Sequence, residues 1–110
     1  MSGTFEIYKD KAGEFRFRLK AGNGQTILAS EGYSDKSGCS NGVESVKKNA
    51  PDDKRYERKT TASGKYMFNL MAGNHKVIGT SESYEAEASR ENGIESVKKN
   101  APLAKVVDQS

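Results

Sequence analysis

The stretch NGVESVKKNAP at residues 41–51 returns as NGIESVKKNAP at residues 92–102, with Val43 against Ile94 as the single difference. Extending the alignment at a constant offset of 51 positions pairs residues 5–51 with residues 56–102, and 21 of the 47 pairs are identical. Identity at a fixed spacing indicates an internal duplication. Because a unit of about 50 residues buries little surface alone, we expect the repeats to share one core about a pseudo-twofold axis.

The length of the chain, 110 residues, fits one domain and is short for two. We therefore expect residues 1–110 to form a single domain made of two repeats, 5–51 and 56–102. Residues 52–55 are then a connector inside the domain, and residues 103–110 are a C-terminal tail.

The central part of each repeat alternates between apolar and polar residues, as a strand with one buried face does. In residues 14–21 the inward positions are aromatic or aliphatic, and the outward positions include Arg16, Arg18 and Lys20. In the second repeat the matching outward positions are Met67, Asn69 and Met71. Gly22-Asn23-Gly24 predicts a tight hairpin after the first of these strands.

Flanking segments complete three antiparallel strands per repeat. The hairpin signals at residues 10–13 and 22–24 predict strands at 5–9 and 25–30, and a corresponding set in the second repeat. The β-branched pair Val106-Val107 predicts an additional strand near the C-terminus.

A change of period to 3.6 marks a helix at the end of each repeat. Cys39, Val43, Val46 and Ala50 fall on one helical face. The second repeat places Arg90, Ile94, Val97 and Ala101 at the same spacing. The predicted fold class is therefore α+β: tandem βββα repeats that share one antiparallel sheet, with helices packed on one face and pseudo-twofold symmetry.

Other residues of these helices carry further expectations. Glu44 with Lys48, and Glu95 with Lys99, have the i,i+4 spacing of stabilising ion pairs. Gly42 and its repeat Gly93 predict a close approach of the helix backbone to the sheet, with a break between two shorter helices as the alternative.

Three ordered blocks, each present twice, resemble the YegP family of small, mostly bacterial proteins with one or two copies of a domain of unknown function. The blocks are the GxFxFxLxAxNG strand and hairpin at residues 13–24, the SExY segments at 30–33 and 81–84, and the doubled NG[VI]ESVKKNAP. The resemblance implies a single sheet with terminal strands exchanged between halves, and it implies no catalytic residues. Gly38-Cys39-Ser40 departs from Ser89-Arg90-Glu91, so the first helix is expected to begin late or fray.

The sequence favours a protein without catalytic residues. His75 is the sole histidine and lies beside a glycine-asparagine turn, where a solvated turn residue is a better interpretation than a triad base. Cys39 falls on the apolar helix face, which favours a buried and inert thiol. With one cysteine and one histidine, we expect no metal site and no cofactor.

Six polar residues recur at equal positions in the two repeats. A carboxylate pair formed by Glu31 and Glu82 could serve acid/base chemistry or hold a divalent cation. Helix capping and hydrogen bonds at the corner between strand and helix are the favoured alternative. The six residues are Ser30, Glu31, Tyr33, Ser81, Glu82 and Tyr84.

The outward strand face is the candidate binding surface. If helices cover one side of the sheet, Arg16, Arg18 and Lys20 line the other side, next to Met67, Asn69 and Met71. Such a face could bind nucleic acid or a protein partner, although an ordinary solvated face is the simpler interpretation. The net charge of +3 permits nucleic-acid contact without requiring it.

Three function classes follow in order. The first is a non-catalytic protein-interaction or self-association module, because a tandem repeat resembles a fused homodimer whose edge strands can accept another chain. The second is weak, sequence-independent nucleic-acid binding, and the third is an enzyme. Fusion of an ancestral dimer predicts a monomer, and the absence of a signal peptide or an apolar span predicts a cytoplasmic protein with no membrane contact.

Overall fold

A computed structural model describes residues 3–110. The elements of the first repeat are β1 (Thr4–Lys9), β2 (Phe15–Lys20), β3 (Thr26–Ala29) and α1 (Lys36–Asn49). After the 3-10 turn η1 (Asp53–Arg55), the second repeat forms β4 (Tyr56–Thr60), β5 (Tyr66–Met71), β6 (Val77–Thr80) and α2 (Glu87–Asn100). The turn η2 (Ala101–Leu103) then leads to β7 (Lys105–Asp108).

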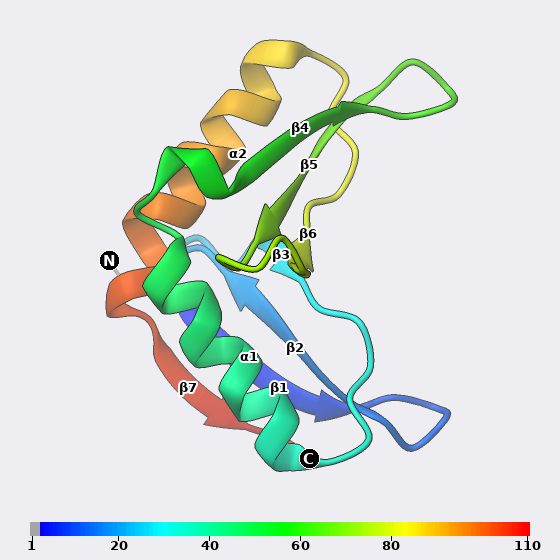
Figure 1. The fold of residues 1–110 in the computed structure, drawn as a ribbon, viewed down its shortest axis with the longest axis vertical. Helices are drawn as coiled ribbons and strands as arrows, with labels where there is room; N and C mark the ends of the chain where they lie inside the picture. Colours follow the sequence, from blue (N-terminus) through cyan, green and yellow to red (C-terminus); the bar gives the residue numbers. More distant parts are fainter. Residues whose placement is uncertain (1–2) are drawn as a thin grey trace.

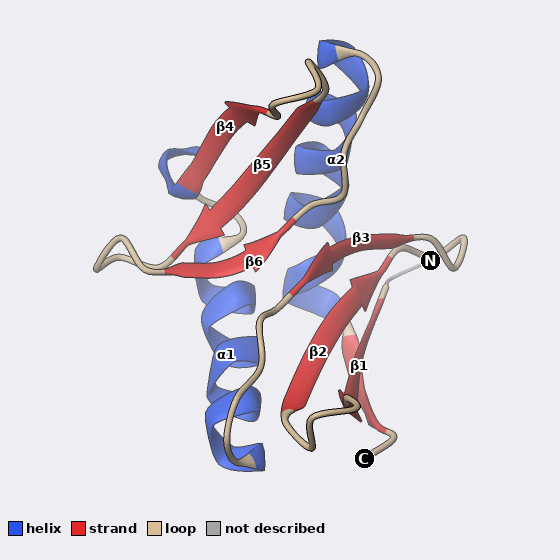
Figure 2. Cartoon of the chain, turned by 90° about the vertical axis from the view of Figure 1, so that its right-hand side faces the viewer, coloured by secondary structure: helices blue, strands red, loops and turns tan. Residues whose placement is uncertain are grey.

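All seven strands belong to one sheet, in the order β4-β5-β6-β3-β2-β1-β7. Neighbouring strands are antiparallel except at one end, where β7 runs parallel to β1. Both helices lie on one face of the sheet, and Figure 2 looks onto the opposite, open face with the helices behind it. The predicted α+β fold is confirmed, with the parallel β7 as an addition to the antiparallel sheet.

The two repeats meet between β3 and β6. These strands pair through Ala29 and Thr80, which occupy the same position in their repeats, so the pseudo-twofold axis passes between them. Symmetry is broken beside the axis because Leu28 corresponds to Gly79. A Cβ on Gly79 would lie 2.6 Å from a methyl carbon of Leu28, so the absence of a side chain in one repeat makes room for the leucine of the other.

The core lies between the sheet and the two helices. Phe17 and Leu19 point from β2 into it, as Phe68 and Leu70 do from β5, and all four are fully buried. Each helix contacts both halves of the sheet: α1 packs on β1 and β2 and also on β5 and β6. One hydrophobic cluster therefore draws on both repeats.

The helix starts differ from the prediction. The first helix begins at Lys36, which is the position equivalent to the start of α2 at Glu87, so the expected late start or fraying is wrong. Asp35 explains this, because its Oδ1 accepts a hydrogen bond of 2.7 Å from the Gly38 N–H and caps the helix. The second helix follows Ala86 and has no such side-chain cap.

Gly42 lies in the middle of an unbroken α1, so the alternative of two shorter helices is wrong. A Cβ at this position would lie 2.5 Å from the Tyr33 hydroxyl oxygen and 3.0 Å from the Phe17 ring. Gly93 meets Tyr84 and Phe68 in the same way. The predicted close approach of each helix to the sheet is confirmed, and it depends on a residue without a side chain.

The C-terminal strand β7 lies in the tail that follows the second repeat, and it pairs with β1 of the first repeat (Figure 1). The exchange of terminal strands that the resemblance implied is therefore found for β7, whereas β4 in the described sheet pairs with β5 of its own repeat. Among residues 3–110, no helix has the length and apolar character needed to cross a membrane.

Candidate functional site

The predicted basic row lies on the open face of the sheet, and each of its three cations already has a carboxylate partner. Arg16 Nε donates to Asp10 Oδ2 at 2.6 Å, and Arg18 Nε donates to Glu6 Oε1 at 2.7 Å. The ammonium of Lys20 lies 3.4 Å from the same Glu6 oxygen. The facing of this strand is as expected, but the row does not present free positive charge.

These ion pairs affect titration. The hydrogen bond from Arg18 lowers the pKa of the Glu6 carboxyl, although burial opposes the shift. In the same way the hydrogen bond from Arg16 lowers the pKa of Asp10. The guanidinium of Arg18 also lies 4.5 Å from the centre of the Tyr8 ring, an additional contact that holds it on the sheet.

The second half of the open face has a different character. Asn69 Nδ2 donates to Glu57 Oε1 at 3.0 Å, and Asn69 Oδ1 accepts from the Thr80 hydroxyl at 2.9 Å. Met67 and Met71 are half-buried. Because β3 and β6 lie between β2 and β5, the expectation that this trio adjoins the basic row is wrong.

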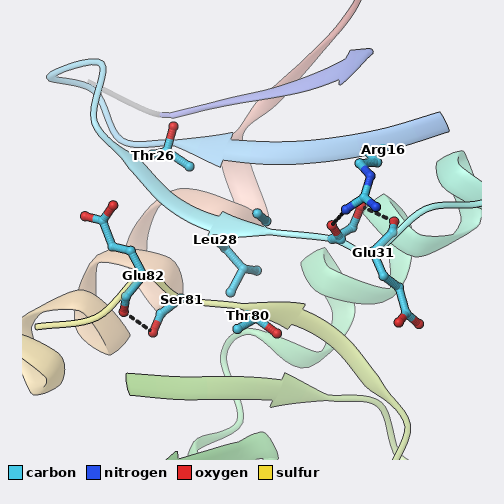
Figure 3. A pocket seen from close by; sticks show the side chains of 9 residues that line it. Arg16, Thr26, Leu28, Glu31, Thr80, Ser81 and Glu82 are labelled. Atoms are coloured by element: carbon cyan, nitrogen blue, oxygen red, sulfur yellow. Dashed lines mark hydrogen bonds between the residues drawn. The ribbon is translucent and has the colours of Figure 1, made fainter. Parts of the chain in front are cut away.

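A groove of about 480 Å³ runs along the boundary between β3 and β6 (Figure 3). Ala29 is among the residues that line it. Leu28 and Thr80 lie near its middle, and Glu31 and Glu82 lie toward opposite ends. Both glutamates are exposed, and Glu82 accepts a hydrogen bond of 3.4 Å from the side chain of Gln25. In the part of the chain that the structure describes, no three His, Cys, Asp or Glu side chains gather in a way that could hold a metal ion.

Ser30 and Ser81 have matching structural roles at this groove. Each hydroxyl accepts a hydrogen bond of 2.9 Å from a backbone N–H of the central strand, Phe17 for Ser30 and Phe68 for Ser81. Each also donates at 2.8 Å to the carbonyl of the following glutamate. The predicted hydrogen bonding at the corner is confirmed, whereas helix capping by these residues is wrong, because Asp35 is the cap of α1.

Tyr33 and Tyr84 belong to the same corners. Their backbones bridge to Phe15 and Tyr66, and their hydroxyls lie beneath the helix glycines. Burial raises the pKa of both phenols. These tyrosines therefore set the spacing between strand, corner and helix.

Cys39, weighed as a nucleophile, and His75, weighed as a triad base, have the surroundings expected from the sequence. Cys39 is 0% exposed, and burial raises the pKa of its thiol. His75 is exposed in the β5–β6 turn with a φ of 67°, so it occupies a left-handed turn position.

The edges of the sheet contain features that sequence reasoning missed. At one edge, β4 is closed by charged side chains: Arg58 donates to Glu91 at 3.0 Å and to Asp53 at 3.1 Å. Arg90 of α2 donates to Glu91 at 3.0 Å and, at 3.4 Å, to the backbone carbonyl of Lys59. A network of ions therefore covers β4 on the helix side.

At the other end of the described sheet, β1 is covered by the strand β7 and not by an ion network. Arg58 and Arg90 correspond to Ile7 and Cys39 of the first repeat, which are buried where β7 pairs with β1. At both pairs of aligned positions the first repeat has an apolar residue and the second has an arginine. This difference in the sequence indicates that the additional strand lies against the edge of the first repeat.

The outer strand β7 has only β1 as a neighbour in the described sheet. All four of its residues are exposed, with Val106 at 43% and Val107 at 37%. Lys36 of α1 binds Asp108 at 2.8 Å, and the Gln109 N–H donates to the Ile7 carbonyl at 2.7 Å, so the strand is held at its end.

Comparison with known proteins identifies relatives of the whole chain. The model of a domain of unknown function, DUF1508, matches residues 10–57 and again residues 62–108. A UPF0339 protein encoded in the 5′ region of the ptx operon of Stutzerimonas stutzeri is 78% identical over 108 residues, covering 98% of this chain and 97% of the relative. The UPF0339 protein YegP of Escherichia coli is 49% identical over 110 residues, covering 100% of both chains.

Two solution structures of relatives have the same fold. The structure of yegP from E. coli, a protein of unknown function, superposes with a TM-score of 0.94 at 50% identity, covering 99% of this chain and 94% of that one. The UPF0339 protein SO3888 from Shewanella oneidensis gives 0.92 at 47% identity, covering 98% and 92%. With its two DUF1508 repeats and full-length relatives, the chain belongs to the UPF0339 family of YegP-like proteins.

Proposed function

We propose that this protein is a non-catalytic interaction module that self-associates weakly through the outer edge of β7. The observation that supports this most strongly is the contrast between the two edges of the sheet. Charged residues and their ion pairs line β4, which is how proteins commonly prevent edge-to-edge pairing. On β7 the charged residues are confined to the two ends, Lys105 and Asp108, and the central residues Val106 and Val107 are exposed.

A second copy fits this edge by symmetry. Two β7 strands can pair antiparallel about a twofold axis normal to the sheet, which joins the sheets with both open faces on the same side. Val107 shares the face of its β1 partner Glu6, and one register places Val107 directly opposite its own copy. An edge of four residues is far smaller than the area of a stable interface, so we expect association only at high concentration.

The test is sedimentation equilibrium across a wide range of protein concentration, with amide NMR spectra over the same range. We expect the apparent mass to rise and the amides of residues 105–108 to shift. Val107→Lys should abolish both effects. Val77→Lys is the matched control because Val77, at 42% exposed, lies away from this edge on β6. A constant mass and constant spectra for the wild type would overturn the proposal.

Nucleic-acid binding has weaker support, because Glu6 and Asp10 already neutralise much of the basic row. A phosphate would have to compete with these carboxylates for each cation. If the row does contact three phosphates, affinity should fall with salt at a log-log slope of about −2 to −3. Titration with single- and double-stranded DNA and RNA at low salt distinguishes this alternative from self-association.

A further inference from the structure

A pocket lies between the last turn of α1 and the β5–β6 hairpin, well removed from β7 along the sheet. Its volume is about 370 Å³. The helix side is lined by Ser45, Lys48 and Asn49, η1 supplies Arg55, and the hairpin supplies Ala72, Gly73 and Asn74. Figure 2 shows the hairpin beside the end of α1 that leads to η1.

Lys48 has no ion-pair partner among residues 3–110. The predicted pair with Glu44 does not form, because that carboxylate lies 4.0 Å from Lys47 instead. Arg55 contributes a second cation, with its Nη2 3.7 Å from the position that a Cβ on Gly73 would take. Its own ion pair with Asp52 is long, at 3.6 Å, and both side chains are partly exposed to water. Two cations therefore line one small pocket.

The hairpin adds hydrogen-bond donors. The turn is closed by the His75 N–H, which donates to the Ala72 carbonyl at 2.9 Å, and by the Lys76 N–H, which donates to Asn74 Oδ1 at 3.1 Å. The N–H groups of Gly73 and Asn74 make no hydrogen bond within the described chain. Free backbone donors in a turn are a common means of binding an anion.

The negative end of the α1 dipole works against an anion here, but nearby donors satisfy part of it. The Tyr56 hydroxyl donates to the Ala50 carbonyl at 2.8 Å, and the Asp52 N–H donates to the Asn49 carbonyl at 3.0 Å. Two of the final carbonyls are thus hydrogen-bonded, which reduces the negative potential that an incoming ligand would meet.

The second repeat provides an internal comparison. A matching pocket is formed by Ala21, Gly22 and Asn23 with Ser96, Lys99 and Asn100, at positions equivalent to those of the first pocket. The residue that corresponds to Arg55 is Thr4, and the carboxylate of Glu95 also lines this pocket. The second pocket therefore combines one cation with one anion.

From this combination we infer that the pocket between α1 and the β5–β6 hairpin binds the phosphate group of a small phosphomonoester. A planar guanidinium, an ammonium and free turn amides match a dianionic phosphate better than a single carboxylate. The volume is at the lower end for ligand pockets, which limits the organic part of the ester to a small group. Neither the basic row nor the β7 edge takes part.

The experiment is an amide NMR titration with inorganic phosphate and with phenyl phosphate, both at constant ionic strength. We expect saturable shifts at Gly73, Asn74 and residues 45–49, with the tighter dissociation constant for phenyl phosphate. Lys48→Ala and Arg55→Ala should each weaken binding about tenfold, the loss of one charge-assisted hydrogen bond. Lys99→Ala, the same change in the matching pocket, should leave the affinity unchanged.

A variant that is expected to increase the affinity serves as a control, because loss of structure could only decrease it. Asp52→Asn removes the carboxylate that competes for Arg55 and should tighten binding. Equal weakening by Lys99→Ala, or equal shifts at Gly22 and Asn23, would overturn the inference by showing general attraction to positive charge. Binding of phenyl phosphate no tighter than that of inorganic phosphate would overturn the assignment to an ester.

Discussion

Single substitutions between the repeats account for much of the asymmetry of the molecule. Where Cys39 is buried beside β7, the equivalent Arg90 is also buried, with 6% exposed, but it binds Glu87 and Glu91 and reaches the edge of β4. The stem of a long cation can be buried while its guanidinium stays hydrogen-bonded. The same helix position is therefore occupied by a buried thiol where β7 covers the sheet edge, and by a hydrogen-bonded arginine at the β4 edge.

Among single residues, Glu6 gives a prediction about how stability depends on pH. Its folded pKa is lowered by Arg18, so it stabilises the fold above its unfolded pKa of about 4.3, and this contribution is lost as the pH falls through the folded value. Glu6→Gln should reduce the free energy of unfolding at pH 6, and the deficit should shrink at pH 3. Urea denaturation at the two pH values measures both quantities.

Glu31→Gln is the control for this experiment, because Glu31 is exposed and forms no ion pair within residues 3–110. It should change stability little at either pH. A deficit for Glu6→Gln that is equal at pH 6 and pH 3 would contradict the assigned role of the Arg18 hydrogen bond.

At the scale of elements, the helices provide a paired test of capping. Asp35→Ala should lower stability by about 1 kcal/mol because it removes the acceptor for the Gly38 N–H. Ala86→Asp places the same side chain at the equivalent position of α2, which has no side-chain cap, and should raise stability by a similar amount. Thermal unfolding of both variants checks the signs, and a loss of stability in Ala86→Asp would show that α2 cannot use a cap.

Elements whose evidence is local could be predicted from the sequence. Alternation from Phe15 to Lys20 predicted β2 and its facing, and the apolar spacing from Cys39 predicted α1. The start of α1 was missed because Asp35 lies before the first apolar position, where periodicity gives no information. The ion pairs of the basic row were missed because they depend on side-chain positions across the β1–β2 hairpin, such as the register that sets Glu6 opposite Arg18. The alternation along a single strand gives no information about the side chains of its neighbour.

At the scale of the whole molecule, neither repeat is complete without the other. Residues 1–51 alone would lack the contacts that α1 makes with β5 and β6 and the strand that covers β1. We expect this fragment to be unfolded or dimeric, as judged by amide NMR dispersion and sedimentation. A stable monomer with well-dispersed spectra would contradict a core shared by the repeats.

The repeats have also ceased to be interchangeable, because Leu28 fills the space that Gly79 leaves open beside the axis. A molecule built from two first repeats would bring two leucines together at this point, and one built from two second repeats would leave a cavity. The side chains of the two repeats are therefore complementary at this contact, as in a heterodimer whose subunits have different sequences.

The pairing of β7 with β1 has a consequence for the order in which the fold forms during translation. The ribosome makes β1 before any other strand, yet the residues that lie against its outer edge are made after every other strand of the sheet. Until β7 emerges, the nascent chain exposes an edge with Phe5 and Ile7 beside it, and α1 lacks the ion pair between Lys36 and Asp108. We therefore expect the first half to complete its fold only when the end of the second has been made, with a late, concerted closure rather than stepwise folding of the repeats.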